Sequence, residues 1–150
     1  MKIRSAGHKD LPGITRCARD FFVYAKYTEQ GMPLNENDFQ AMVGKYIDDG
    51  VVLLMDDGQI RGGIAGMMND WGFNNSIKVM VELFYWVDPE CRGVSSLKLL
   101  KAFERASKSL GADKIFMVSV GTDIQDQVGN LYKRMGYKEH ERFYIKGDLL

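Results

Sequence analysis

The sequence predicts an α/β fold of the α+β kind, with a mixed, mostly antiparallel sheet of about six strands and about four helices on its faces. Three observations support this prediction. The apolar residues change period several times along the chain, between the spacing of helices and the alternation of strands. Three strands in the middle of the chain follow one another without an intervening helix. With 45% hydrophobic residues and no repeat or linker, residues 1–150 are expected to form one domain.

The first third of the chain is expected to form a strand and two amphipathic helices. Residues 1–4 alternate apolar and basic side chains, and Asp10 is typical of a helix N-cap. This helix is predicted to end near Tyr27, before a polar connector. A second helix should stop at Asp49-Gly50, because its apolar residues recur at helical spacing up to that point. These residues are Phe39, Met42, Val43, Tyr46 and Ile47.

Strands are expected in the middle of the chain. An apolar run at 51–55, a turn at 56–59 and a second run at 60–68 predict a β-hairpin. A polar loop at 69–76 then precedes the longest predicted strand, residues 77–87. Alternation along this strand places four side chains on one face, namely Met80, Glu82, Phe84 and Trp86. Glycines in the second run predict close backbone packing or a bulge, at Gly62, Gly63 and Gly66.

The last third is predicted to contain a helix, a strand, a second helix and a final strand. The first of these helices should end at Gly111. Its inward side chains are expected to be Leu99, Leu100, Phe103, Ala106 and Leu110. A buried strand is expected at 115–120 and a last strand at 143–145. Between them, Asp126 is expected to cap a short helix that Gly136 closes.

Composition and charge argue against several function classes. The chain has 20 basic and 20 acidic side chains, so no global field would draw it to nucleic acid or to an anionic membrane surface. No stretch approaches the length of a signal-peptide core or a membrane span, so a cytoplasmic protein with no membrane partner is expected. Cys17 and Cys91 form no CxxC pair, so no metal site is expected.

The junction after the longest predicted strand has the features of an anion-binding site. The strand ends near Val87, and a short loop with Arg92 and Gly93 leads into a helix. The first turn of a helix exposes unpaired N–H groups and a partial positive charge, and an arginine adds a bidentate cation. The alternative is that Ser95 and Ser96 only cap the helix and that Arg92 is a surface residue.

Two segments resemble signatures of the GNAT (GCN5-related) N-acetyltransferase superfamily. Residues 87–93, with the sequence VDPECRG, are similar to the family's V-x-P-x-x-R-G. Residues 131–137, with the sequence LYKRMGY, resemble its L-Y-x-x-x-G-F/Y. The predicted order of elements is also similar to the family's over nearly the whole chain. The resemblance implies transfer of the acetyl group of acetyl-CoA to a primary amine of a small molecule, peptide or protein. A non-catalytic acyl-CoA-binding or interaction module is the alternative.

The resemblance also implies where the cofactor binds. In this family the loop and the helix start hold the pyrophosphate of acetyl-CoA, and main-chain N–H groups near the end of the strand polarise the thioester. The implied cofactor residues are Val87, Arg92, Gly93, Val94, Ser95, Ser96 and Tyr132. The family pattern R-G-x-G-x-G/A has small residues where this chain has Ser95, Ser96 and Leu97, and a leucine there would narrow the groove. Little sequence follows 143–145, which is compatible with a shortened sheet or with a homodimer that completes it.

Two residues are candidates for proton transfer. Tyr132 aligns with the tyrosine that in this family protonates the departing CoA thiolate, and its alternative role is packing against the sheet. Glu82 is the candidate base for the incoming amine, because desolvation by apolar neighbours would raise its pKa. Alternatively, Glu82 is a surface carboxylate paired with Arg61 or with a lysine.

The acceptor is expected to bind beside two segments. The family resemblance suggests the connector after the first helix, and exposed aromatic residues suggest the predicted loop at 69–76. The candidate lining residues are Tyr24, Tyr27, Met32, Asp70, Trp71 and Phe73. A dimer contact is the alternative role for Trp71 and Phe73.

Overall fold

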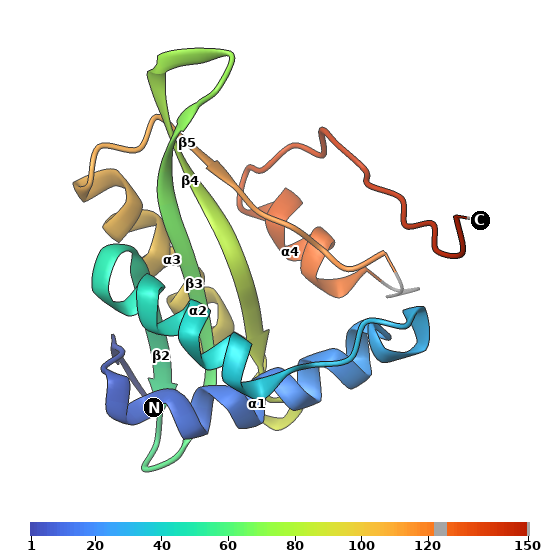
Figure 1. Cartoon of the computed structure of the whole chain (residues 1–150). Coiled ribbons are helices and arrows are strands. Elements are labelled where there is room, and N and C mark those ends of the chain that lie inside the picture. The colour runs from blue at the N-terminus through green and yellow to red at the C-terminus, as the bar shows by residue number, and fades with distance from the viewer. Residues whose placement is uncertain (122–125, 150) are drawn as a thin grey trace.

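A five-stranded sheet forms the centre of the computed structural model, which describes residues 1–121 and 126–149 (Figure 1). The strands are β1 (Lys2–Ser5), β2 (Val51–Asp56), β3 (Ile60–Trp71), β4 (Asn74–Val87) and β5 (Lys114–Phe116). They lie side by side in chain order. Neighbours are antiparallel from β1 to β4, whereas β5 runs parallel to β4. The sheet is therefore mixed and mostly antiparallel, as predicted, and the described residues form five strands where about six were expected.

Two pairs of helices cover the two faces of the sheet (Figure 1). The helices are α1 (Leu11–Ala25), α2 (Glu36–Asp49), α3 (Val94–Ser109) and α4 (Gln127–Arg134), and short 3₁₀ helices span His8–Asp10, Thr28–Gln30 and Pro89–Cys91. On one face α1 and α2 bury Ile14 and Val43 against the sheet. On the other, α3 and α4 bury Phe103 and Tyr132. The predicted fold class is confirmed.

The helix starts lie where they were predicted, but one of them is built differently. Asp10 precedes α1, yet its carboxylate does not cap the helix. It accepts hydrogen bonds from the Gly7 N–H at 2.8 Å and from the Arg4 guanidinium at 2.8 and 2.9 Å. Asp126 does cap α4, because its carboxylate accepts the Gly129 N–H at 3.1 Å. The Asp10 carboxylate therefore connects the start of α1 with Arg4 on β1. The local sequence does not predict this contact.

β3 and β4 form a longer hairpin than was predicted. Their ladder extends to the pair Trp71 and Asn74, so the prediction of a polar loop at 69–76 is wrong. Only Gly72 and Phe73 lie between the two strands. The tip of the hairpin projects beyond the helices (Figure 1), and polar side chains suit both of its faces because both meet water.

A β-bulge in β4 changes the face on which its side chains lie. The ladder skips Leu83, between the pairs that Glu82 and Phe84 make with β3. Met80 packs in the core beside α3, whereas Phe84 packs in the core beside α1 and α2. The predicted common face of these residues with Trp86 is therefore wrong, because one extra residue reverses the alternation.

The predicted close packing at the glycines of β3 is confirmed. A Cβ atom at Gly66 would lie 2.6 Å from the ring of Phe103, and one at Gly62 would lie 2.5 Å from the carbonyl oxygen of Trp86. Both distances are well below normal contact distances between heavy atoms. A side chain at either position would therefore displace α3 or β4.

The C-terminal part differs most from the predictions. β5 has three residues where a buried strand was expected at 115–120, and Phe116 and Val118 are 46% and 51% exposed. Residues 143–145 form no strand and are exposed. No strand within residues 1–121 and 126–149 pairs with the outer edge of β5, so these apolar side chains have no sheet to join. Leu110 was expected inside but is exposed, because it lies just beyond the end of α3.

Candidate active site

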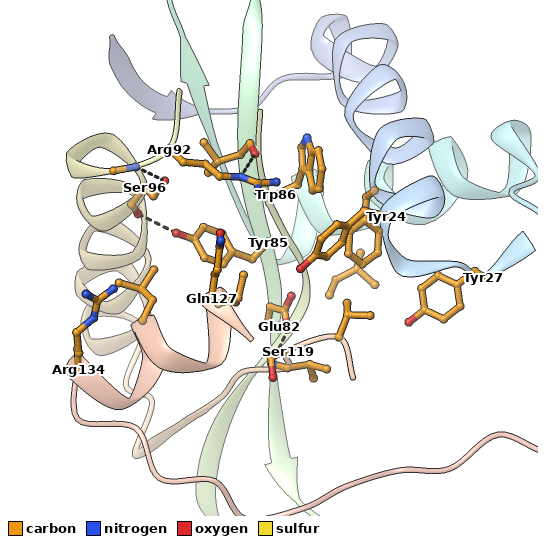
Figure 2. Close-up of a pocket in the computed structure, with 18 of the residues that line it drawn as sticks. Tyr24, Tyr27, Glu82, Tyr85, Trp86, Arg92, Ser96, Ser119, Gln127 and Arg134 are labelled. Carbon is orange, nitrogen blue, oxygen red and sulfur yellow. Dashed lines mark hydrogen bonds between the residues drawn. The ribbon is translucent and has the colours of Figure 1, made fainter. Parts of the chain in front are cut away.

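A cavity lies beside the end of the short pairing between β4 and β5. The two strands pair only where residues 79–81 meet residues 114–116, and they separate beyond this point. A cavity of about 410 Å³ opens beside the separation. Its walls come from α1, β4, the start of α3, residues 118–120 and α4 (Figure 2). Candidate cofactor and catalytic residues therefore meet at one site.

The start of α3 opens on this cavity. Gly93, which precedes the helix, has φ of 122°, a conformation that side chains disfavour. Its N–H donates to Ser96 Oγ at 3.3 Å, and the hydroxyl of Tyr85 donates to the Ser96 carbonyl at 3.0 Å (Figure 2). The first helical hydrogen bond runs from the Leu97 N–H to Gly93, so the N–H groups of residues 94–96 precede it. Three donors at a rigid helix start are well suited to a phosphate group.

The predicted cofactor residues do not all face the cavity. Val87, Arg92, Gly93 and Ser96 line it. Val94 and Ser95 are absent from its described lining, and the Val94 side chain is 70% exposed. The contribution of these two positions is therefore limited to their main-chain N–H groups. Ser96 combines both suggested roles, because it caps the Gly93 N–H and also lines the cavity.

Arg92 is held in place by its neighbours. Its Nε donates to the Val87 carbonyl at 2.9 Å, and its guanidinium lies 5.0 Å from the ring centre of Trp86 and 6.0 Å from that of Tyr24 (Figure 2). Arg92 is exposed, and it also lines the cavity. It is thus a surface cation that these contacts hold at the cavity.

Asp88 supports this arrangement, and the sequence analysis did not single it out. Its carboxylate is buried and accepts two hydrogen bonds from Arg16 on α1, at 2.8 and 2.9 Å. It also accepts the indole N–H of Trp86 at 3.1 Å. The bidentate contact with Asp88 raises the pKa of Arg16 above its usual range. No local signal predicts this contact, because 72 residues separate the two side chains.

Glu82 lies at the point where β4 and β5 separate (Figure 2). Its carboxylate accepts the Val118 N–H at 3.0 Å, and burial raises the pKa of Glu82 to about 7 although this hydrogen bond acts in the opposite direction. Arg61, the suggested ion-pair partner, contacts Asp57 and Glu90 instead. Glu82 is therefore a carboxyl group whose proton equilibrium lies near neutral pH.

Tyr132 contacts the same residue, Val118, at its carbonyl group. Its hydroxyl donates to the Val118 carbonyl at 3.1 Å, and its ring stacks on Tyr85 at 6.2 Å between centroids. Burial, with Glu82 nearby, raises the pKa of Tyr132 above its usual range. Tyr132 is absent from the described lining of the cavity. The ring of Tyr132 therefore packs against Tyr85 of the sheet, and its hydroxyl bonds to Val118, the residue that Glu82 also contacts.

The expected acceptor residues divide into two groups. Tyr24 and Tyr27, on and after α1, line the cavity. Asp70, Trp71 and Phe73 lie at the tip of the β3–β4 hairpin, at the opposite end of the molecule from the α1–α2 connector (Figure 1). The two hairpin aromatic rings pack on each other at 5.2 Å. Met32 is exposed and is not in the described lining. The hairpin residues are therefore not part of this site.

Within residues 1–121 and 126–149, no group of three or more histidine, cysteine, aspartate or glutamate side chains is arranged to hold a metal ion. No helix in the same ranges is both long and apolar enough to cross a bilayer.

Comparison with known sequences decides the family. The family model described as the acetyltransferase (GNAT) family matches residues 15–137, which include the β4–α3 junction and α4. The chain belongs to the GNAT acetyltransferase family. Members of this family use acetyl-CoA, and the donors at the start of α3 with the positioned Arg92 fit its pyrophosphate. No curated protein matches the sequence.

Solved structures show the GNAT fold over nearly the whole chain. The GCN5-related N-acetyltransferase of Ralstonia eutropha is 20% identical, with a TM-score of 0.75 over 97% of each chain. A predicted acetyltransferase of Clostridium acetobutylicum, solved with acetyl-CoA, is 15% identical, with a TM-score of 0.74 over 97% of this chain and 95% of that one. An aminoglycoside acetyltransferase from an uncultured soil metagenomic sample is 16% identical, with a TM-score of 0.71 over 97% of each chain. At these identities the likeness establishes the fold.

Proposed function

We propose that this GNAT protein transfers the acetyl group of acetyl-CoA to a primary amine of a small molecule, peptide or protein, by direct attack in a ternary complex. The observation that carries the proposal is Glu82, a carboxyl group with a pKa of about 7 in the cavity onto which the start of α3 opens. A base with this pKa is well matched to a neutral working pH. The homodimer, the cytoplasmic location and the single domain over residues 1–150 remain predictions.

The cofactor site follows from the same cavity. The pyrophosphate of acetyl-CoA would accept hydrogen bonds from the N–H groups of Val94, Ser95 and Ser96, with Arg92 as the nearby cation. Gly93 allows close approach of the phosphate, because it has no side chain. The pantetheine arm would lie along the open edge of β4, where main-chain N–H groups near Val87 polarise the thioester carbonyl.

The chemistry needs two proton transfers. The amine nitrogen attacks the thioester carbon, a C–N bond forms, and Glu82 takes the proton that the amine loses, directly or through one water. The C–S bond then breaks, and the thiolate of CoA receives a proton from Tyr132. The phenol of Tyr132 is protonated at neutral pH, and burial raises the pKa of Tyr132 and makes it a weaker acid, so the basic thiolate must draw the proton from it. Glu82 and Tyr132 contact the N–H and the carbonyl of the same residue, Val118, which supports a shared role at this segment.

Ligand binding and turnover test the proposal together. Acetyl-CoA at about 100 times its dissociation constant should stabilise the protein by about 2.7 kcal/mol, which corresponds to roughly 5 to 10 °C in melting temperature for a chain of this size. Thermal unfolding with acetyl-CoA, and thiol release in the presence of a panel of amines, measure the two steps. No stabilisation at millimolar acetyl-CoA would contradict the cofactor site.

Replacing Tyr132 by Phe is expected to lower kcat by about 100-fold while acetyl-CoA still stabilises the protein, because only the proton donor is removed. Steady-state CoA release measures kcat, and thermal unfolding measures binding. Tyr46→Phe on α2 is the control, since Tyr46 is partly buried and packs on the other face of the sheet from Tyr132. Unchanged kcat in Tyr132→Phe would assign Tyr132 a packing role alone.

A non-catalytic acyl-CoA-binding module is the second candidate. It is favoured by Ser95, Ser96 and Leu97, which stand where the family pattern has small residues. In that case acetyl-CoA would stabilise the protein, and no amine in the panel would release CoA above the background rate.

A further inference from the structure

A second cavity adjoins the first and has a different chemical character. It has a volume of about 480 Å³ and lies between α1, α2, the connector that joins them and β4. Four residues line both cavities, namely Phe21, Tyr27, Leu83 and Trp86. The two cavities are therefore neighbouring compartments with a shared wall of aromatic and aliphatic side chains.

The bulge in β4 connects the two compartments. Glu82 lines the first cavity, Leu83 lines both, and Phe84 lines the second. With about 3.4 Å of rise per residue, the main chain from Glu82 to Phe84 spans roughly 7 Å. Leu83, which lines both cavities, is thus the neighbour in sequence of the carboxylate that would accept the amine proton.

The walls of the second cavity are mostly apolar. Aromatic rings come from α1, α2 and β4, among them Phe22, Phe39 and Phe84. Asp38 is the one charged side chain in the described lining, and it is exposed. Cys17 is uncharged at neutral pH, because burial raises the pKa of its thiol to about 11. Such walls favour an apolar group, and they offer no cation to an acidic acceptor.

Charge also argues against a polyamine. Each additional ammonium group that entered this cavity would lose its water, and only Asp38 at its edge offers a counter-charge. The volume lies within the range of small-molecule pockets and has room for a ring or a branched aliphatic group. The wall chemistry thus favours a monoamine with an apolar group.

We infer that the acceptor is a small primary amine with an aromatic or bulky aliphatic group, which occupies the second cavity while a linker of about two carbons brings the amine to Glu82. This inference rests on the proposed acetyl transfer. It adds the class of acceptor, which the cavity beside Glu82 does not define.

Three amines with different side groups test the acceptor class. The initial rate of CoA release would be measured with 2-phenylethylamine, with 2-aminoethanol, which has the same two-carbon linker, and with spermidine. Burial of the phenyl ring should make kcat/KM for 2-phenylethylamine about 10- to 100-fold higher than for 2-aminoethanol. Spermidine is expected to be the poorest of the three.

A charge placed in the second cavity tests its location. Met42→Asp adds a carboxylate on α2 at a residue that lines this cavity and is 39% exposed, so folding is expected to persist. It should raise KM for 2-phenylethylamine about tenfold, and acetyl-CoA should stabilise it as much as it stabilises the wild type. Val23→Asp is the matched control, because Val23 lies on α1, is 81% exposed and lines neither cavity. It should leave both constants unchanged.

The outcomes separate the two proposals. Equal or higher kcat/KM for 2-aminoethanol or spermidine would overturn the acceptor class and leave acetyl transfer in place. An unchanged KM for 2-phenylethylamine in Met42→Asp would overturn the location. CoA release with none of these three amines, while another amine of the panel releases CoA, would overturn the acceptor class alone. Release with no amine of the panel, while acetyl-CoA still stabilises the protein, would overturn acetyl transfer and with it the acceptor class.

Discussion

Replacing Glu82 by Gln is expected to lower kcat by about 100-fold or more and to remove the rise of the rate with pH near 7. Glutamine has nearly the same shape but cannot take a proton, and positioned acid–base groups contribute about 100- to 10,000-fold. In the wild type the rate should increase tenfold per pH unit below about 7 and level off above it, because the carboxyl group must be ionised to act as a base. A pH profile of kcat/KM in both proteins measures this.

The same substitution should make the protein more stable at alkaline pH. The pKa of Glu82 is raised from its usual 4.5 to about 7, so between these values the folded protein holds a proton that the unfolded chain has released. Stability therefore falls as pH rises through this window and stays low above it. The difference in pKa corresponds to about 3 kcal/mol. Glu82→Gln should thus unfold at a higher temperature than the wild type at pH 8, with a smaller difference at pH 5.

An exposed carboxylate provides the control for both effects. Glu139 is half exposed, and Arg142 lowers the pKa of Glu139. Glu139→Gln should therefore leave the pH profile of kcat/KM unchanged. It should not make the protein more stable at pH 8. If Glu82→Gln kept full activity and the inflection near pH 7, the base would be another group.

Replacing Asp88 by Ala is expected to destabilise the protein by about 3 kcal/mol, which lowers the melting temperature by roughly 6 to 12 °C. The carboxylate is 3% exposed and accepts hydrogen bonds from Arg16 and Trp86. Its removal leaves the buried indole N–H of Trp86 without its acceptor and takes the bidentate partner from Arg16, which is 38% exposed. Because Trp86 supports Arg92, KM for acetyl-CoA should also rise several-fold. Thermal unfolding and steady-state kinetics measure the two effects.

Asp20 offers a matched control, since it pairs with the same arginine. It accepts a hydrogen bond from Arg16 at 2.9 Å and is 52% exposed. An exposed ion pair of this kind contributes less than about 1 kcal/mol. Asp20→Ala should therefore lower the melting temperature by no more than a few degrees, and it should leave KM for acetyl-CoA unchanged. Equal losses in Asp20→Ala and Asp88→Ala would show that burial of the Asp88 carboxylate is unimportant.

Much of the fold was predictable because its signals are local. The period of the apolar residues located all four described helices, and the turn at 56–59 located the first hairpin. The glycines of β3 predicted close packing for the same reason, since a missing side chain is visible in the sequence itself. Strand ends were harder to predict at 69–76 and at 115–120, because pairing with a neighbour, and not composition, decides where a strand stops.

The candidate site was predicted only in part. Residues 87–93 and 131–137 identified the family, and from it followed the cofactor loop and Tyr132. The apolar sequence neighbours of Glu82 predict a raised pKa, and the pKa of Glu82 is raised. The burial that raises it comes from the tertiary structure and not from those neighbours on one strand face. The bulge at Leu83 turns Glu82 away from the face that holds Phe84 and Trp86 and toward the segment at Val118.

The sequence by itself determined the family, the order of the elements and the residue types at the α3 start, because each depends on residues that are near one another in the chain. Only the tertiary structure decided which of these residues act together. The Asp88 contact with Arg16, the contacts of Glu82 and Tyr132 with Val118, and the apolar cavity near Glu82 each join segments far apart in sequence. Burial, pKa and cavity shape are properties of such contacts, so they arise only when the strands and helices have packed.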